Sequence, residues 1–199
     1  MKDRVGGSLQ DLIERPEWPY FIPSQLIDLE SVKYADSLRR VEKAFPSGTA
    51  KEKGDSLEEL ADCLLGSIKA FKVNPKELTP SGELDRYLTV SKIPGTLLQD
   101  WSTYVPVECK NWGEPVGVQV INDLYAKAKK MGSNRGILFS REGVTGTANF
   151  DGWREIVNLF VSDRYVTIVI NLEDLKSIES GTNPLDVIER YQRAVHVGA

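Results

Sequence analysis

The sequence predicts an α/β fold in which a mixed β-sheet is flanked by helices and preceded by an N-terminal helical arm. Amphipathic helical segments alternate along the chain with short apolar or alternating segments that are typical of strands. Three early strands lie close enough in sequence to form an antiparallel meander, whereas the last two are separated by a helix, as in a parallel βαβ unit. The 199 residues are enough to bury one sizeable core.

Residues 1–50 are interpreted as an N-terminal arm and helix, and residues 51–199 as the main domain. The first 23 residues contain Gly6-Gly7 and three prolines, which indicate an irregular segment. From Ser24 to about Ala44 the apolar spacing is helical. The polar stretch from Pro46 to Gly54 is predicted to be a connector.

The main domain is predicted to begin with a helix and a meander. Asp55 or Ser56 can cap a helix whose apolar face recurs up to Ile68. A short strand is expected from Phe71, a turn over residues 79–82, a second strand over 83–90, and a third over 102–111. These three strands can pair in antiparallel order.

The second half of the domain predicts the parallel part of the sheet. A helix is expected to start at Pro115, because proline is favoured in the first helical turn. An apolar strand over 136–140, a helix over 149–162 and an apolar strand over 165–172 then form the βαβ unit. A helical tail is expected from Pro184 to Val195.

Composition limits the chemistry and the compartment. No apolar run reaches the ~20 residues of a membrane-spanning helix, and the first ten residues lack a signal-peptide pattern, so we expect a cytoplasmic protein. With only Cys63, Cys109 and His196 available, zinc sites and Cys-His or Ser-His-Asp catalysis are disfavoured. Any metal is therefore expected to be held mainly by oxygen atoms.

The charge balance is weak evidence about partners. The net charge of −4 argues against a surface that is basic throughout. One basic run is a candidate local patch, although a solvated helix face explains most runs of this kind. This run contains Lys127, Lys129, Lys130, Arg135 and Arg141.

The residues that suggest chemistry lie on the second and third predicted strands and on the first helix of the main domain. Glu108 and Lys110 are two apart on a strand, so their side chains should share a face. Asp85 lies on the preceding strand, and Glu58 can approach from the helix. Converging carboxylates repel one another, and a divalent cation offsets that repulsion.

Such a site suits Mg²⁺, with Mn²⁺ as a substitute, because magnesium prefers hard oxygen ligands and is commonly held by one or two carboxylates plus substrate phosphate. Lys110 could orient an attacking water and stabilise negative charge on a phosphate. The metal would activate that water, and a second ion could assist the leaving oxygen. The competing interpretation is that Glu-x-Lys is only a charged solvent face.

Six segments of the sequence carry a resemblance to a known family. The bipartite pattern resembles the Asp…Glu-x-Lys signature of the PD-(D/E)XK nuclease superfamily, which has the restriction-endonuclease-like fold, and the following segments resemble Mrr-type restriction endonucleases and related stand-alone nucleases. The resemblance covers about residues 53–175. The matching segments are Lys53-Gly54-Asp55-Ser56-Leu57-Glu58-Glu59-Leu60, Gly82-Glu83-Leu84-Asp85, Val107-Glu108-Cys109-Lys110-Asn111-Trp112, Pro115-Val116-Gly117, Gly136-Ile137-Leu138-Phe139-Ser140 and Gly143-Val144-Thr145-Gly146.

The resemblance implies a role for each matching residue. Asp85 becomes the central metal ligand, Glu108 the second ligand and Lys110 the catalytic lysine, with the backbone carbonyl of Cys109 as a further ligand. Glu58 becomes the metal-assisting carboxylate of the helix, and Glu59 is its rival because adjacent residues differ by about 100° around a helix. Gln119 matches a glutamine that family members often carry on the next helix.

Several neighbouring residues leave alternatives open. Arg86 places a charge where the family usually continues with an apolar strand, and it is expected to face solvent or contact phosphate. Trp112 is expected to be buried against the next helix, with a base-stacking platform as the alternative. Glu83 is a minor candidate for the Asp85 face. Arg141 and Thr145 are expected in a plain turn that could instead approach nucleic acid.

The resemblance implies a metal-dependent deoxyribonuclease, an endonuclease by expectation, with restriction, repair or phage defence as its context. The alternative is a catalytically silent nucleic-acid or protein interaction module. A glycoside hydrolase is disfavoured because Lys110 has no role there, and no phosphate-cradling glycine motif indicates a nucleotide-binding enzyme. RNA stays open as a substrate. A homodimer would supply the two sites that paired cuts need, and partner proteins could supply specificity.

Overall fold

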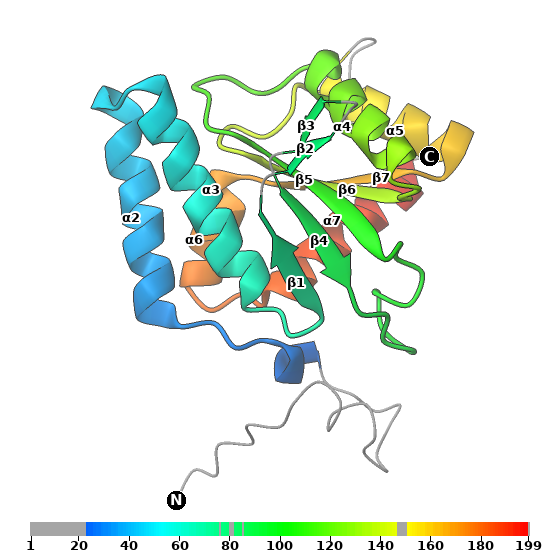
Figure 1. The fold of residues 1–199 in the computed structure, drawn as a ribbon, viewed down its shortest axis with the longest axis horizontal. Coiled ribbons are helices and arrows are strands. Elements are labelled where there is room, and N and C mark those ends of the chain that lie inside the picture. Colours follow the sequence, from blue (N-terminus) through cyan, green and yellow to red (C-terminus); the bar gives the residue numbers. More distant parts are fainter. Residues whose placement is uncertain (1–22, 76, 80–81, 85, 147–150, 199) are drawn as a thin grey trace, which may run out of the picture.

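The computed structural model describes residues 23–75, 77–79, 82–84, 86–146 and 151–198, with side chains described over 25–75, 86–146 and 151–198 (Figure 1). A five-stranded sheet forms its centre, in the order β1-β4-β5-β6-β7. The strands span Phe71–Asn74 (β1), Arg86–Val90 (β4), Tyr104–Lys110 (β5), Arg135–Ser140 (β6) and Val166–Ile170 (β7).

The sheet is mixed, as predicted. β1, β4 and β5 pair antiparallel, whereas β5, β6 and β7 pair parallel. The predicted βαβ unit is confirmed by β6, the helix Gly152–Asp163 (α5) and β7. Every described residue of β6 and β7 is buried, which is typical of parallel strands covered on both faces.

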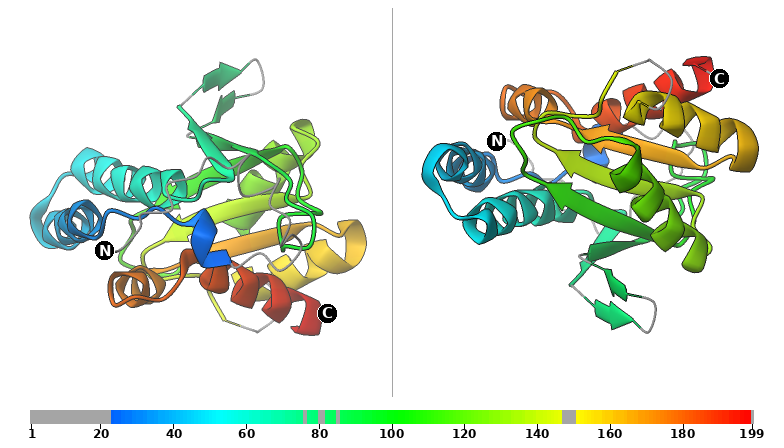
Figure 2. Two further views of the ribbon diagram at one scale, coloured as in Figure 1. Left: turned by 90° about the horizontal axis from the view of Figure 1, so that it is seen from below. Right: turned by 90° about the horizontal axis from the view of Figure 1, so that it is seen from above.

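Helices lie on both sides of the sheet (Figures 1 and 2). The helix Ala50–Gly66 (α3) packs against β1 and β5, with the helix Ser31–Ser47 (α2) outside it. The helix Val118–Lys130 (α4) and α5 cover the opposite face, and the helix Pro184–Gly198 (α7) runs along β7. Among the described residues, no helix combines the length and apolar character that a membrane crossing requires.

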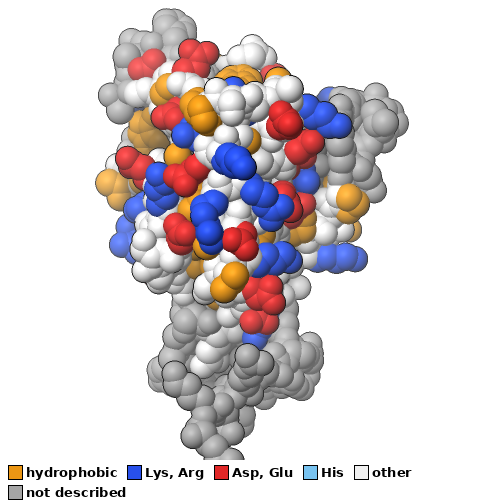
Figure 3. All heavy atoms as spheres, turned by 90° about the vertical axis from the view of Figure 1, so that its left-hand side faces the viewer, with side chains coloured by type: hydrophobic (Ala, Val, Ile, Leu, Met, Phe, Trp, Pro, Cys, Tyr) orange, Lys and Arg blue, Asp and Glu red, His pale blue; other side chains and the backbone are white. Residues whose placement is uncertain are grey.

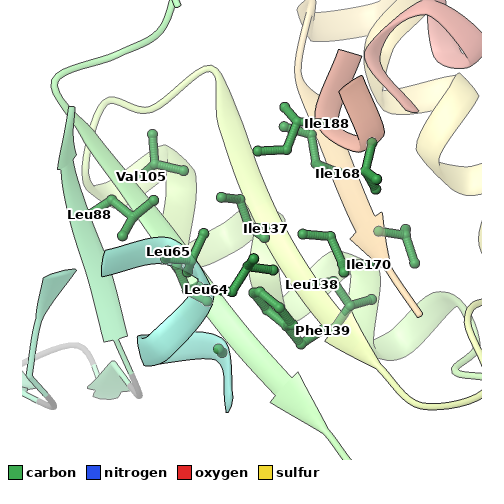
Figure 4. Packing of buried hydrophobic residues seen from close by; sticks show 14 of the residues in the cluster. Leu64, Leu65, Leu88, Val105, Ile137, Leu138, Phe139, Ile168, Ile170 and Ile188 are labelled. Carbon is green, nitrogen blue, oxygen red and sulfur yellow. The ribbon is translucent and has the colours of Figure 1, made fainter. Parts of the chain in front are cut away.

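One continuous apolar core joins these layers. Leu64 and Leu65 of α3 lie in this core together with Leu88 and Val105 of the sheet (Figure 4). The N-terminal helix belongs to the same core, because Tyr34 of α2 is buried and donates a hydrogen bond from its hydroxyl to the carbonyl of Leu175 at 3.0 Å. The face that carries α2 mixes Lys and Arg with Asp and Glu (Figure 3).

The start of α3 differs from the prediction. The helix begins at Ala50, inside the segment expected to be a connector, and its cap is Thr49 instead of Asp55 or Ser56. The Thr49 hydroxyl accepts from the Glu52 N–H, while the Glu52 carboxylate accepts from the Thr49 N–H at 2.7 Å. This reciprocal capping box stabilises an additional turn and a half of helix.

The chain between β1 and β4 also differs from the prediction. The strand expected over residues 83–90 is divided: Gly82–Leu84 (β3) pairs with Glu77–Thr79 (β2) in a separate two-stranded sheet, and only β4 joins the main sheet. The meander β1-β4-β5 is therefore present, with the β2-β3 hairpin inserted into its first connection.

Further element boundaries depart from the expectation, and the helix predicted from Ser24 begins at Ser31 (α2). α4 begins at Val118, after Gly117, and Pro115 lies before it because Val116 makes a bridge with Val144. The strand expected over 165–172 ends at Ile170, and the helix Leu172–Glu179 (α6) follows at once. Asn171 caps α6 by accepting from the Asp174 N–H at 2.9 Å. The remaining described element is the 3-10 turn Pro23–Leu26 (η1).

Candidate functional site

β5 brings Glu108 and Lys110 together, as the period of a strand predicts. Val107 is buried, with 1% of its surface exposed. Because side chains alternate along a strand, Glu108 points to the opposite face of the sheet from Val107. Lys110 Nζ lies 2.6 Å from Glu108 Oε1. The acid and the ammonium therefore form a direct, charge-assisted hydrogen bond on one face of the sheet.

Lys127 of α4 completes this contact. Its Nζ lies 2.6 Å from Glu108 Oε2, so each carboxylate oxygen accepts from a different ammonium. From the sequence, Lys127 was predicted only to be one member of a basic run. Its position seven residues after the buried Val120 places it on the sheet-facing side of α4, and this spacing is the signal that could have found it.

The three side chains line a pocket of about 360 Å³ between β5 and α4. Glu108 is 6% exposed, and burial of a carboxylate is costly unless cations or donors satisfy it. The described lining carries three ammonium groups and two carboxylates, a set that can bind an anion such as phosphate. The lining residues are Glu108, Lys110, Val120, Asp123, Ala126, Lys127 and Lys130.

Glu58, on α3, approaches the sheet from the opposite face to the one on which the Glu108 side chain lies. Its carboxylate binds Arg86 Nη1 at 2.5 Å, and Arg86 pairs across the strands with Val107, which faces away from Glu108. The structure therefore does not bring Glu58 to the Glu108 pocket. Its rival Glu59 points toward α2, where it binds Arg40 at 2.9 Å, with both side chains 54% exposed.

Arg86 neither faces solvent nor stands free for a phosphate. Its side chain is 16% exposed and also binds Asp62 through Nε. Burial alone would lower the pKa of Arg86, but the hydrogen bonds with Asp62 and Glu58 outweigh it and raise that pKa. Arg86 therefore joins β4 to α3 through its ion pairs with Glu58 and Asp62.

Asp85, the predicted central ligand, lies outside the described residues, and the side chain of Glu83 lies outside the described side chains. The structure does describe their neighbours. Arg86, next in the chain to Asp85, pairs with Val107, next in the chain to Glu108. The strand that begins after Asp85 (β4) and the strand that carries Glu108 (β5) are therefore adjacent and antiparallel.

Gln119 does not enter the pocket. Its side chain is exposed and donates from Nε2 to Asp123 Oδ1 at 2.8 Å, one turn along α4. Cys109 lies between Glu108 and Lys110 on β5, is half-buried and packs against the core. Its thiol therefore points away from the Glu108 pocket, as strand alternation predicts.

Trp112 is exposed, which overturns the expected burial against the next helix. The indole is 45% exposed, and Lys110 Nζ lies 5.7 Å from the centre of its ring. Three glycine or proline positions between Trp112 and α4 keep this segment from continuing into the helix. They are Gly113, Pro115 and Gly117.

The basic run does not form a single patch. Lys127 binds Glu108, Lys129 binds Asp163 at 3.3 Å, and Arg135 is 6% exposed, where burial lowers its pKa. Arg141 stacks on Phe45, with its guanidinium carbon 3.8 Å from the ring centre. Thr145 Oγ1 accepts from the Gly152 N–H, at the start of α5, at 2.7 Å.

The described residues fit magnesium in part. Glu108 is a hard oxygen donor in a pocket, and Asp123 shares that pocket. Within the described part of the chain, no group of three or more His, Cys, Asp or Glu side chains gathers closely enough to hold a metal ion. A cation at Glu108 would compete with Lys110 and Lys127 for the two carboxylate oxygens.

Comparison of the chain with protein-family models, with curated proteins and with solved structures gives no match. The residues and geometry of the site are therefore the basis for proposing a function.

Proposed function

We propose that this protein is a metal-dependent phosphodiesterase that hydrolyses DNA at the pocket between β5 and α4. The observation that carries the proposal is the contact of Lys110 with a buried Glu108, in a pocket with two more lysines. This arrangement suits a phosphate group, because it offers a carboxylate to a metal ion and ammonium groups to phosphate oxygens. The sequence resemblance adds the reaction class.

Each described residue then has a chemical task. Glu108 holds the cation, and Lys110 neutralises negative charge that develops on the scissile phosphate. Lys127 orients the Glu108 carboxylate through its contact with Oε2. Mg²⁺, or Mn²⁺ in its place, supplies a water of lowered pKa and charge neutralisation on phosphate oxygens when it is bound. Asp85 is the proposed second carboxylate for the metal, on the strength of the sequence signature alone.

Biological context and assembly are part of the same proposal. The family resemblance favours restriction, repair or phage defence in the cytoplasm, with RNA as an alternative substrate. Cutting both strands of a duplex needs two sites, which a homodimer would provide. Partner proteins are the proposed source of sequence specificity.

One observation favours a second candidate, a module that binds phosphate groups without turnover. Both oxygens of Glu108 are held by ammonium groups at 2.6 Å. Because both carboxylate oxygens already accept charge-assisted hydrogen bonds, Glu108 should bind a metal ion more weakly than an unpaired carboxylate would. If a cation cannot displace one ammonium, the pocket binds nucleic acid and leaves it intact.

The two candidates are separated by a cleavage assay on plasmid, linear duplex and single-stranded DNA in Mg²⁺, Mn²⁺ or chelator. We expect cleavage in metal, none in chelator, and none by Glu108→Gln or Asp85→Asn. The matched control is Lys129→Ala, which removes an exposed lysine of α4 that does not line the pocket. Binding of all three DNAs with no cleavage in either metal would select the silent module.

A further inference from the structure

A second pocket, on the other side of Lys110, carries features of a nucleobase site. It has a volume of about 500 Å³, within the ~300–1,000 Å³ of typical small-molecule sites. It lies where the end of β5 meets α2 and the first turns of α3. Its lining residues include Phe45, Lys53, Gly54, Lys110, Asn111 and Trp112, with Cys109 and Glu114 also present.

The aromatic surface of this pocket is unusual for its position. Trp112 is one of the few large apolar side chains left exposed in the described part of the chain. An exposed indole offers a flat face on which a base can stack, whatever the base is. The base faces inside a duplex are already covered by stacked neighbours, so a base that stacks on Trp112 must lie outside the continuous stack, as bases do in single strands, overhangs and opened duplexes.

Asn111, which lines the same pocket, carries a buried polar atom that has no hydrogen-bond partner among the described residues. Asn111 is 6% exposed, and its Nδ2 donates to the Lys53 carbonyl at 2.8 Å. Because a carbonyl can only accept, this bond fixes Oδ1 as the remaining group of the amide. Oδ1 is buried and finds no donor among the described residues. Such an acceptor is costly unless a donor reaches it, and bases carry N–H donors on their edges.

Lys110 connects the two pockets. Its ammonium lies 2.6 Å from Glu108 Oε1 and 5.7 Å from the centre of the Trp112 ring. A nucleotide with its base on Trp112 would therefore have its own phosphate close to the acid and ammonium of the proposed catalytic pocket. Lys53 adds positive charge to the same lining, whereas Glu114 is the acidic group that faces it.

We infer that the pocket at the end of β5 binds one unpaired nucleobase, stacked on Trp112 with an N–H directed to Asn111 Oδ1. The inference rests on the proposed function, because it assigns the nucleotide next to the phosphate held by Lys110. It gives that function a substrate class: a single strand, an overhang or a locally opened duplex. The base chemistry is shared by DNA and RNA, so both strands are included in the test.

The test measures binding in chelator, where no metal-dependent cleavage occurs. Fluorescence anisotropy follows the full chain with labelled single strands of about 12 nucleotides, in DNA and RNA form, and with a blunt DNA duplex. We expect Trp112→Ala to weaken single-strand binding about 5- to 150-fold, the usual effect of losing one base stack. Trp112→Phe should retain most of the affinity, and duplex binding should not change.

The matched control is Tyr104→Ala, which removes an aromatic residue of similar exposure, 49%, at the opposite end of β5. A set of strands with one abasic site each then locates the base. At one position, removal of the base should weaken wild-type binding and leave Trp112→Ala unaffected, as expected for two partners of one contact.

Equal losses in Trp112→Ala and Tyr104→Ala, or equal losses on single strand and duplex, would overturn the base site. So would failure of the wild type to bind any single strand. These outcomes are distinct from those of the cleavage assay. Cleavage unaffected by Trp112→Ala removes only the base site, whereas Trp112-dependent binding without cleavage in metal removes only the nuclease.

Discussion

Lys127 on α4 holds one oxygen of Glu108 on β5, at 2.6 Å, while Lys110 of the same strand holds the other. A helix and a strand that are separated by a loop are thus joined at a buried charge. The contact makes Lys127 part of the structure as well as of the proposed site.

Replacement of Lys127 by alanine should lower the free energy of unfolding by about 1–3 kcal/mol, because a buried carboxylate oxygen loses a charged donor. Urea denaturation measures the change. Lys129→Ala, from the same helix, removes an exposed pair and should change stability by no more than about 0.5 kcal/mol. Equal effects of the two variants would show that the Glu108 contact does not stabilise the fold.

Two glycine-to-alanine variants should have opposite signs. Gly54 lies inside α3 with no atom within 4 Å of an added Cβ, so Gly54→Ala should stabilise by about 0.5–1 kcal/mol through helix propensity. At Gly136, an added Cβ would lie 2.2 Å from the Tyr165 hydroxyl and 3.0 Å from Leu124 Cγ, so Gly136→Ala should destabilise. Chemical denaturation of both variants gives the two signs, and stabilisation by Gly136→Ala would contradict the packing of α4 and Tyr165 on β6.

Removal of the Arg86 side chain should lower the free energy of unfolding more than removal of the exposed Arg40 side chain. Arg86→Ala would leave Glu58 and Asp62 side by side without the cation between them, at a cost of about 1–3 kcal/mol. Arg40→Ala, which breaks the exposed pair with Glu59, should cost less than about 0.5 kcal/mol. Thermal unfolding ranks the two variants, and a larger loss in Arg40→Ala would refute the role assigned to Arg86.

Alkaline pH should unfold the protein through buried tyrosines. Burial raises the pKa of Tyr34 far above its ordinary value of about 10. Above pH 10 the unfolded chain releases this proton and the folded chain retains it, so stability falls as the pH rises. Tyr34→Phe removes the titrating group and should flatten the fall. Tyrosinate absorbance and circular dichroism, recorded together, should change in one transition, and ionisation of Tyr34 before unfolding would disagree with its burial.

The sequence predicted the mixed sheet because apolar strands with an intervening helix leave few ways to pair. It also predicted that the side chains of Glu108 and Lys110 share a face of the strand, because strand alternation is a local property. The spacing within α4 indicates only that Lys127 lies on the sheet-facing side of the helix. Its contact with Glu108 depends in addition on how α4 lies over β5, which no local pattern contains. α6 was missed because eight residues carry little periodicity, although Asn171 and Asp174 form a recognisable capping pair.

The exposure of Trp112 was missed for a similar reason. The residue follows a strand and precedes a helix, and its burial depends on where the intervening loop leaves the sheet. The early start of α3, by contrast, could have been predicted from the sequence. Thr49 and Glu52 have the spacing of a capping box, but they lie in a segment whose composition suggested a connector.

The central claim is that the Glu108–Lys110 pair acts on a phosphodiester bond. Its most direct test is the single-turnover rate of hydrolysis of an end-labelled DNA strand in Mg²⁺ by wild type, Lys110→Ala and the control Lys129→Ala, all verified as folded by circular dichroism. If this claim is right, Lys110→Ala loses on the order of 100-fold or more of the rate, as is typical when a group that stabilises transition-state charge is removed, and Lys129→Ala keeps the wild-type rate. An equal rate in wild type and Lys110→Ala would contradict it.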